Sequence, residues 1–170
     1  LDAKAEEWLE HGLLQIEREQ FKAIRLVHAS GPSVEISRPD KDGAWVLAGG
    51  GQVNSAALEE LLRQAGKLDF VKLGDPGATP AALGRAKVTR VELELFDKRI
   101  YRLTIGEVTP GKEGNNFATA EAALDSSVTD EALRKTVDEF NQRFKNRMLA
   151  VYDFEVKPFL MARKDYVQAK

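Results

Sequence analysis

The residue pattern closest to a ligand-binding motif is a glycine run in front of a predicted helix. Residues 49–51 are three consecutive glycines, and Asn54 and Ser55 follow them. Backbone N–H groups at the start of a helix can bind a phosphate. The run lacks the lysine and the hydroxyl residue that a phosphate-binding loop has at fixed spacing. We interpret it as a flexible loop that ends in an Asn or Ser helix cap.

Histidine and serine chemistry is not indicated. His11 and His28 lie on different predicted elements and have no Asp, Glu or His partner at metal-ligand spacing. His28 is expected at a strand end, where a solvated histidine is common. Ser33, Ser126 and Ser127 have no base at a recognisable spacing and no nucleophile-elbow glycines around them.

Two glutamates on a predicted strand suggest paired carboxylates for acid–base catalysis. Glu92 and Glu94 are two residues apart, so both side chains lie on one face of the strand. Arg90 and Arg102 are available to neutralise them. A surface ion-pair ladder therefore explains the two carboxylates without catalysis.

The densest basic and apolar cluster is the possible partner surface. Arg143, Lys145 and Arg147 lie close to Phe144 in the sequence. Such a cluster fits a protein partner or a membrane surface. The preferred interpretation is structural: the cations favour a helix C-terminus, and one arginine packs its stem over the core. We predict no catalytic, cofactor-binding or metal-ligating residue, and no cofactor.

Composition narrows the class further. The chain has 170 residues, with Lys+Arg 25 against Asp+Glu 27, so it has no basic excess for nucleic acid. It has no cysteine, which excludes zinc ribbons, thiol catalysis and disulfides. No apolar run approaches eighteen residues. We interpret Leu1 as the start of a processed or partial chain, so that any membrane anchor lies outside it.

The elements are expected to come in two similar sets. In the first, strands over residues 21–28, 34–38 and 44–47 precede a helix that ends at Gly66. In the second, a hairpin over 88–105 with Asp97-Lys98 as its turn, strands over 117–120 and 123–128, and a helix capped by Thr129 follow. The predicted hairpin sets an apolar face against the core and Glu92 opposite Arg102 on the polar face.

This order predicts an α+β protein of two similar β-β-β-α units, with antiparallel sheets that each pack one helix. The units lie either side by side or as a pseudo-two-fold pair. The expected organisation is an N-terminal helix and lead-in strand (1–20), a first unit (21–73), a linker (74–87), a second unit (88–150) and a C-terminal strand or the start of a following domain (151–170).

The predicted core consists of the apolar positions on the inward faces of these elements. They are Ile24, Leu26, Val34, Ile36, Trp45, Leu58, Leu62, Val91, Leu93, Leu103, Ile105, Leu133, Val137 and Phe140.

Four segments resemble one bacterial family. They are residues 18–26 (REQFKAIRL), 45–47 (WVL), the hairpin 91–107 and residues 144–149 (FKNRML). Together they resemble the family catalogued as domain of unknown function 4340. The sequence departs from the family's usual Asp-Gly hairpin turn by having Asp97-Lys98.

The resemblance implies a cellular setting. Members of this family resemble membrane-anchored envelope proteins with an N-terminal transmembrane helix, often found beside ABC-type transport or gliding-type systems. It assigns no catalytic residue. We therefore expect a soluble, periplasmic, non-enzymatic accessory or scaffold domain whose partners are envelope or transporter proteins. The alternative is a ligand-binding module that uses the groove between the two units.

Overall fold

The computed structural model of the chain describes residues 12–73, 87–108 and 115–169. The strands are β1 (Gly12–Gln15), β2 (Phe21–Val27), β3 (Val34–Ser37), β4 (Val46–Leu47), β5 (Lys67–Asp69), β6 (Lys72–Leu73), β7 (Thr89–Leu95), β8 (Arg99–Val108), β9 (Asn115–Leu124) and β10 (Leu149–Tyr152). The helices are α2 (Ser55–Gly66), α3 (Glu131–Phe144) and α4 (Asp153–Leu160), with short 3-10 turns η1 (Arg18–Gln20) and η3 (Arg163–Tyr166). The predicted N-terminal helix and most of the predicted linker lie outside the described residues.

Eight of the strands form one antiparallel sheet in the order β4-β3-β2-β7-β8-β9-β10-β6. The α+β class is thus confirmed. The expectation of separate sheets is wrong, because β2 from the first predicted unit pairs directly with β7 from the second. Strands with apolar inner faces bury more surface by joining in one sheet than by leaving two edges exposed. Whether the halves are true repeats stays a prediction.

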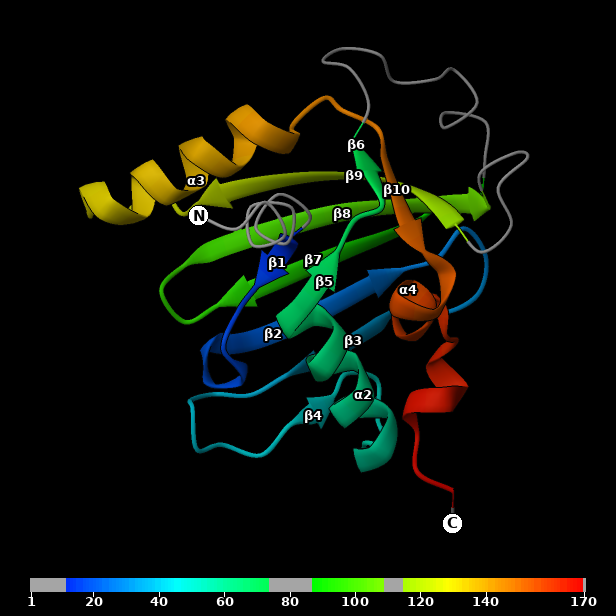
Figure 1. Cartoon of the computed structure of the whole chain (residues 1–170). Helices are drawn as coiled ribbons and strands as arrows, with labels where there is room; N and C mark the ends of the chain where they lie inside the picture. The colour runs from blue at the N-terminus through cyan, green and yellow to red at the C-terminus, as the bar shows by residue number, and fades with distance from the viewer. Residues whose placement is uncertain (1–11, 74–86, 109–114, 170) are drawn as a thin grey trace, which may run out of the picture.

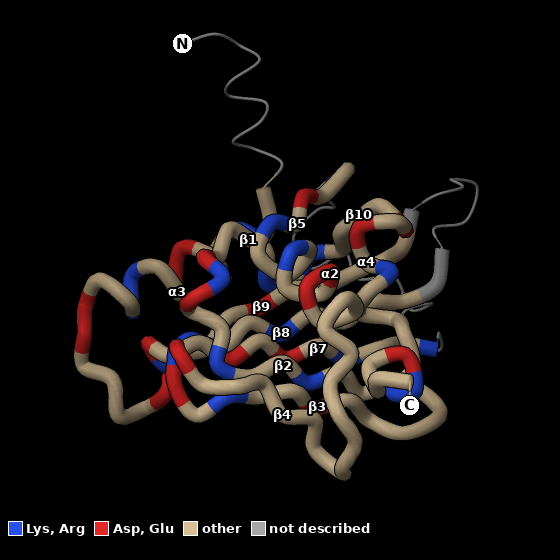
Figure 2. Tube along the Cα trace, turned by 90° about the horizontal axis from the view of Figure 1, so that it is seen from below, with Lys and Arg blue, Asp and Glu red and all other residues tan. Residues whose placement is uncertain are grey.

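The helices and a small second sheet cover one face of the large sheet (Figure 1). Helices α2 and α4 lie in front of it, α3 runs beside β9, and β1 pairs with β5 as a two-stranded ribbon. Acidic and basic positions are interleaved along β2, β7 and β8 (Figure 2), and ion pairs among Arg25, Glu92 and Glu94 place these side chains on the opposite face. This division gives each strand one apolar and one polar face.

The sequence of β7 shows why. Val91, Leu93 and Leu95 alternate with charged residues and are almost completely buried. In the hairpin with β8, Val91 faces Leu103 and Glu92 faces Arg102, as predicted. A shift of one residue would expose the whole apolar set, so the register is strongly specified.

Most of the predicted core is buried, with three exceptions. Trp45 and Phe140 are only partly buried and pack against the rim of the core. Leu133 is partly exposed on the first turns of α3. Trp45 lies just before β4, Leu133 lies in the first turn of α3, and Phe140 lies further along the same helix, edge-on to the Tyr101 ring.

The two longer helices begin at side-chain caps. The Asn54 side chain accepts bonds from two backbone N–H groups of α2, which confirms one of the two predicted caps. For α3 the cap is Asp130 and not Thr129. An Asp side chain accepts such bonds at least as well as Thr, so the start moves by one residue.

Helix α3 protects an otherwise open strand edge. The Asn141 amide donates to the carbonyl oxygen of Ala122 (2.8 Å) and accepts from its N–H (2.7 Å). Strand β10 pairs with β9 only as far as Ala118. The side chain thus takes the place of a neighbouring strand, which limits pairing with other molecules at this edge.

The C-terminal segment forms a helix where a strand was expected. From Asp153 the chain is helical as α4, and η3 follows. Val156 and Phe159 are three residues apart and both fully buried, which is a helical spacing. The strand was expected because the segment is rich in apolar residues, and apolar content alone does not distinguish a helix from a strand. Tyr166 is also fully buried, so this segment packs into the same core.

One buried arginine joins β3 to the turn before β2. Arg38 is 8% exposed, and its guanidinium donates to backbone carbonyl oxygens and lies over two aromatic rings. The acceptors are the carbonyls of Phe21 (2.9 Å), Lys41 (2.8 Å), Arg18 (3.2 Å) and Glu19 (3.1 Å), and the rings are those of Trp45 (4.7 Å) and Phe96 (5.5 Å). The fork of Arg38 therefore fixes the position of η1.

The β7–β8 turn carries a strained residue. Lys98 has a φ of 73°, in the left-handed region that favours glycine. We expect Lys98→Gly to raise the free energy of unfolding by about 0.5–1 kcal/mol, because glycine has no Cβ to clash there. Lys98→Ala, which keeps the Cβ, is the control and should give no gain. Chemical denaturation of the three proteins measures the difference; equal midpoints for the glycine and alanine variants would contradict it.

Candidate functional site

The predicted partner surface is built around a core residue. Phe144 is 3% exposed. Its ring packs against Phe140 at 4.9 Å and edge-on against Phe70 at 5.6 Å between centroids. The aromatic member of the predicted cluster is therefore part of the seam between α3 and the segment that leads to β6.

The basic members of that cluster are engaged at the end of α3. The Arg143 guanidinium lies over the rings of Phe144 (4.9 Å) and Phe70 (5.5 Å). Lys145 Nζ is 3.9 Å from the Glu121 carboxylate, and Arg147 donates to the Arg143 carbonyl (3.2 Å). This is the geometry of the structural explanation, a helix C-terminus with one arginine over the core. A role in partner binding stays a prediction.

The glycine run has the wrong polarity for an anion. Arg163 donates to the carbonyl oxygens of Ala48 (2.9 Å) and Gly50 (2.6 Å), so the loop presents acceptors to a cation. The free N–H groups at the start of α2 are taken by the Asn54 side chain. Gly49 has a φ of 90°, and a Cβ there would lie 3.1 Å from the Arg163 guanidinium. The glycines thus permit this close approach.

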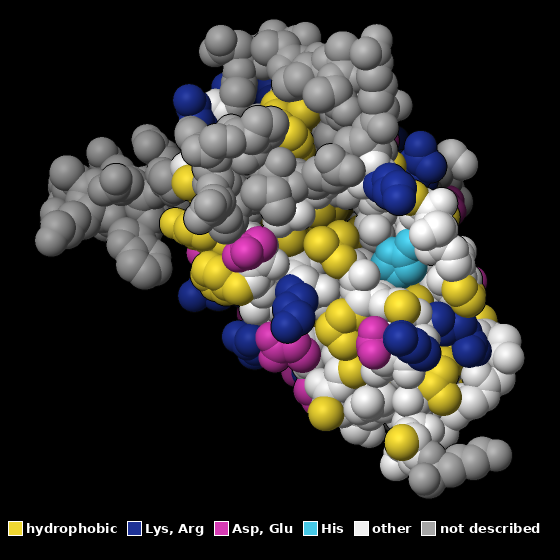
Figure 3. All heavy atoms as spheres, turned by 90° about the vertical axis from the view of Figure 1, so that its right-hand side faces the viewer, with side chains coloured by type: hydrophobic (Ala, Val, Ile, Leu, Met, Phe, Trp, Pro, Cys, Tyr) yellow, Lys and Arg dark blue, Asp and Glu magenta, His cyan; other side chains and the backbone are white. Residues whose placement is uncertain are grey.

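His28 was expected to be solvated, but its side chain is half-buried. Its Nδ1 lies 3.0 Å from the Thr89 hydroxyl, and its Nε2 is buried without a hydrogen-bond partner among the described residues. It borders a hollow of about 250 Å³ that Lys87 and Leu160 also line. Figure 3 shows a histidine at the surface of this face with basic side chains nearby. The other histidine, His11, lies outside the described residues.

The two strand glutamates belong to an ion-pair network on the open face of the sheet. Arg25 of β2 is its centre: the guanidinium is 2.8 Å from Glu92, 3.1 Å from Glu94 and 3.5 Å from Glu35. Arg102 is 3.3 Å from Glu92. The predicted ladder is confirmed, with Arg25 in place of Arg90 as the main partner. Carboxylates held by guanidinium groups are poor general bases.

A serine, an aspartate and a lysine meet near the β7–β8 turn, which sequence spacing had not indicated. The Ser127 hydroxyl donates to Asp125 (2.6 Å) and accepts from Lys98 Nζ (3.1 Å). The bond from Ser127 lowers the pKa of the Asp125 carboxyl. All three residues are exposed. A lysine that activates a serine must be desolvated, so this arrangement fits a turn and not a nucleophile.

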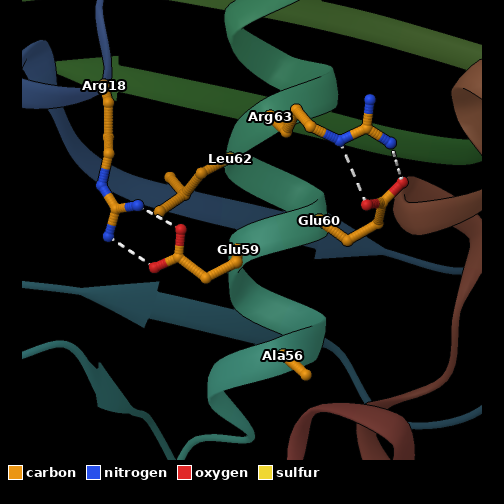
Figure 4. A pocket seen from close by; sticks show the side chains of 6 residues that line it. All are labelled: Arg18, Ala56, Glu59, Glu60, Leu62 and Arg63. Atoms are coloured by element: carbon orange, nitrogen blue, oxygen red, sulfur yellow. Dashed lines mark hydrogen bonds and ion pairs between the residues drawn. The ribbon is translucent and has the colours of Figure 1, made fainter.

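A hollow with a volume of about 410 Å³ lies on α2 (Figure 4). Arg18 from η1 pairs with Glu59 on one side, and Arg63 pairs with Glu60 on the other. The hydrogen bond from Arg63 lowers the pKa of Glu60. Both carboxylates are neutralised by guanidinium groups, so the hollow offers no free acid or base.

The described surface also carries an exposed aromatic pair at the junction of β10 and α4. Tyr152 is 41% exposed and Phe154 63% exposed. Their rings stack with centroids 5.2 Å apart at 25°. This pair was not predicted, because the segment that contains Phe154 was expected to form a strand. The signal available was two aromatic residues, two apart, beside two acidic residues in what becomes the first turn of a helix.

Comparisons with protein-family models, with curated proteins and with solved structures found no match for the chain. No cluster of three metal-ligating side chains occurs among the described residues. In the same part of the chain, none of the helices has the length and apolar character needed to span a bilayer. The resemblance to the family of unknown function therefore stays a prediction.

Proposed function

We propose that this chain is a non-enzymatic interaction domain, an accessory or scaffold part of a bacterial envelope protein associated with ABC-type transport. The family resemblance supports the cellular setting, with the domain on the periplasmic side of a membrane anchor outside the chain. The exposed Tyr152–Phe154 pair is the observation that supports partner binding.

The aromatic pair suits a protein contact better than a purely structural role. Phenylalanine is usually buried, and an isolated surface ring has little reason to stack. Tyrosine and phenylalanine are enriched at protein interfaces, where a few aromatic side chains provide most of the binding energy. Both residues lie at the start of α4, a helix that Val156 and Phe159 anchor in the core.

The charged groups support binding over catalysis. On the open sheet face and in the α2 hollow, the carboxylates lie opposite guanidinium groups. Such pairs are mutually neutralised, and on a surface they contribute little to stability. They keep a flat surface polar, which leaves the aromatic pair as the distinctive apolar feature.

The alternative, a ligand-binding module, was expected to use a groove between the two units, and β2 and β7 leave no groove where they pair. A groove between the two halves requires separated units, whereas β2 and β7 pair from Phe21 to Val27 in the centre of the sheet. That line is closed by backbone hydrogen bonds and buried side chains such as Ile24 and Leu93. No described observation favours a ligand there.

The test is crosslinking of the full-length, membrane-anchored protein in its native host, followed by affinity purification and mass spectrometry. We expect recovery of transporter subunits in stoichiometric amounts. The double variant Tyr152→Ser, Phe154→Ser should reduce that recovery about tenfold or more, because losing two interface aromatics typically costs more than 1.4 kcal/mol of binding.

Val46→Ser is the matched control. Val46 is 60% exposed on the edge strand β4, away from the aromatic pair. It should leave recovery unchanged. If the protein is purified without any transporter subunit, the accessory role is contradicted. If the double variant recovers as much of the subunits as the unaltered protein does, the aromatic pair is not the contact surface.

A further inference from the structure

A half-buried carboxylate follows the aromatic pair in the sequence. Glu155 follows Phe154 in the first turn of α4. Its Oε2 is buried and has no hydrogen-bond partner among the described residues. A buried carboxylate oxygen without a donor loses its hydration and gains nothing in return. The first turn of α4 is therefore less stable when this group is ionised.

The surroundings add a second carboxylate. On β5, Asp69 repels the charge of Glu155, while Lys67 and a hydrogen bond from the Asp69 backbone favour it. Burial and then Asp69 raise the pKa of Glu155 above its ordinary value. The helix itself adds Asp153 and Lys157 as charged neighbours in sequence. The net effect favours the neutral carboxyl.

We propose that protonation of Glu155 consolidates the first turn of α4 and the aromatic pair on it, so that partner binding at this surface is favoured by mild acid. The proposal rests on the proposed function, because it adds a regulator to the same surface. The proton removes both the buried negative charge and the repulsion from Asp69, which outweigh the attraction to Lys67.

The direction with pH follows from the raised pKa. A carboxyl whose folded pKa exceeds its unfolded pKa contributes stability that is fully present below the unfolded value of 4.5. That contribution is lost as pH rises through the folded pKa. Lowering the pH should therefore stabilise α4, whereas lowering the pH usually destabilises a fold through carboxylates that are in ion pairs.

Hydrogen exchange of the backbone amides of Lys157 and Phe159 provides the test, since in a helix they bond to the carbonyls of Asp153 and Glu155. After correction for intrinsic exchange, we expect protection at pH about 4.5 to exceed that at about 7.5 by between twofold and tenfold. Glu155→Gln should keep the higher protection at both pH values, because its amide is neutral. Glu139→Gln, an exposed glutamate on α3, should preserve the pH dependence of the unaltered protein.

Equal protection at both pH values in the unaltered protein, or an unchanged pH dependence in Glu155→Gln, would overturn the proposal. The crosslinking experiment repeated at both pH values separates it from the proposed function. Acid-favoured recovery that becomes pH-independent in Glu155→Gln supports the regulation. Recovery that depends on Tyr152 and Phe154 but not on pH leaves the interaction domain intact and removes the switch. Recovery that depends on neither removes both the switch and the aromatic pair as the contact surface, whereas purification of the protein alone contradicts the proposed function itself.

Discussion

Tyr166→Ala is expected to lower the free energy of unfolding by about 3–5 kcal/mol, the usual cost of removing a fully buried aromatic side chain. Tyr166 is 0% exposed, and its hydroxyl donates to the Pro158 carbonyl in the last turn of α4. Its own carbonyl accepts from the Asn54 N–H at 2.8 Å, at the start of α2. The side chain of Tyr166 thus links the C-terminal segment to α4, and its backbone carbonyl links the same segment to the start of α2.

Tyr166→Phe separates the hydroxyl from the ring. It should cost about 1–2 kcal/mol, because the ring still fills its site while the Pro158 carbonyl loses its donor. Lys164→Ala, at an exposed neighbour in η3, is the control and should stay within about 0.5 kcal/mol of the unaltered protein. Urea unfolding with a fixed slope measures all three. If the free energy of unfolding of Tyr166→Ala were less than about 1 kcal/mol below that of Tyr166→Phe, the burial of the ring would be contradicted.

Arg38→Met should have the second largest effect, a loss of about 3 kcal/mol in the free energy of unfolding. Methionine keeps much of the stem but leaves four backbone carbonyls without the charged donor that they share. Hydrogen bonds to charged groups are worth about 1.5–3 kcal/mol each, and the contributions at one guanidinium do not add. Arg38→Lys should recover only part of the loss, because an ammonium cannot reproduce the planar fork.

Arg63→Met is the matched control for that experiment. The Arg63 side chain is 66% exposed, and among the described residues it pairs with Glu60, three residues earlier. Such an exposed pair contributes little to stability. Similar losses in the Arg38 and Arg63 variants would show that Arg38 is not the support of η1.

The elements predicted correctly are those whose apolar residues repeat with one clear period, either that of a strand or that of a helix. In β7 strict alternation fixed both the strand and the face that it buries, and Asn54 marked the start of α2. Alternation does not say which strand will be a neighbour. The β2–β7 pairing joins segments about seventy residues apart and could not be read from either segment, so the single sheet was missed.

The candidate site was less predictable because exposure depends on tertiary packing. Phe144 and Phe154 are the same residue type in similar polar surroundings, yet one is 3% and the other 63% exposed. Phe144 follows an apolar stripe and meets Phe70, a contact made by distant sequence. Phe154 begins a short helix whose buried side is set by Val156 and Phe159. Local spacing did not distinguish these two situations.

The central pairing of β2 with β7 also has a consequence for folding during synthesis. Arg25 and Glu92, which meet across it at 2.8 Å, are 67 residues apart in the chain. Ribosomes add roughly 5–20 residues per second, so β2 waits several seconds for its central neighbour. During that interval the apolar positions of β2, Ile24 and Leu26, have only the short strand β3 beside them. Pairings between such distant strands form slowly. The nascent first half is therefore the species in which aggregation, or the binding of a chaperone, is most favoured.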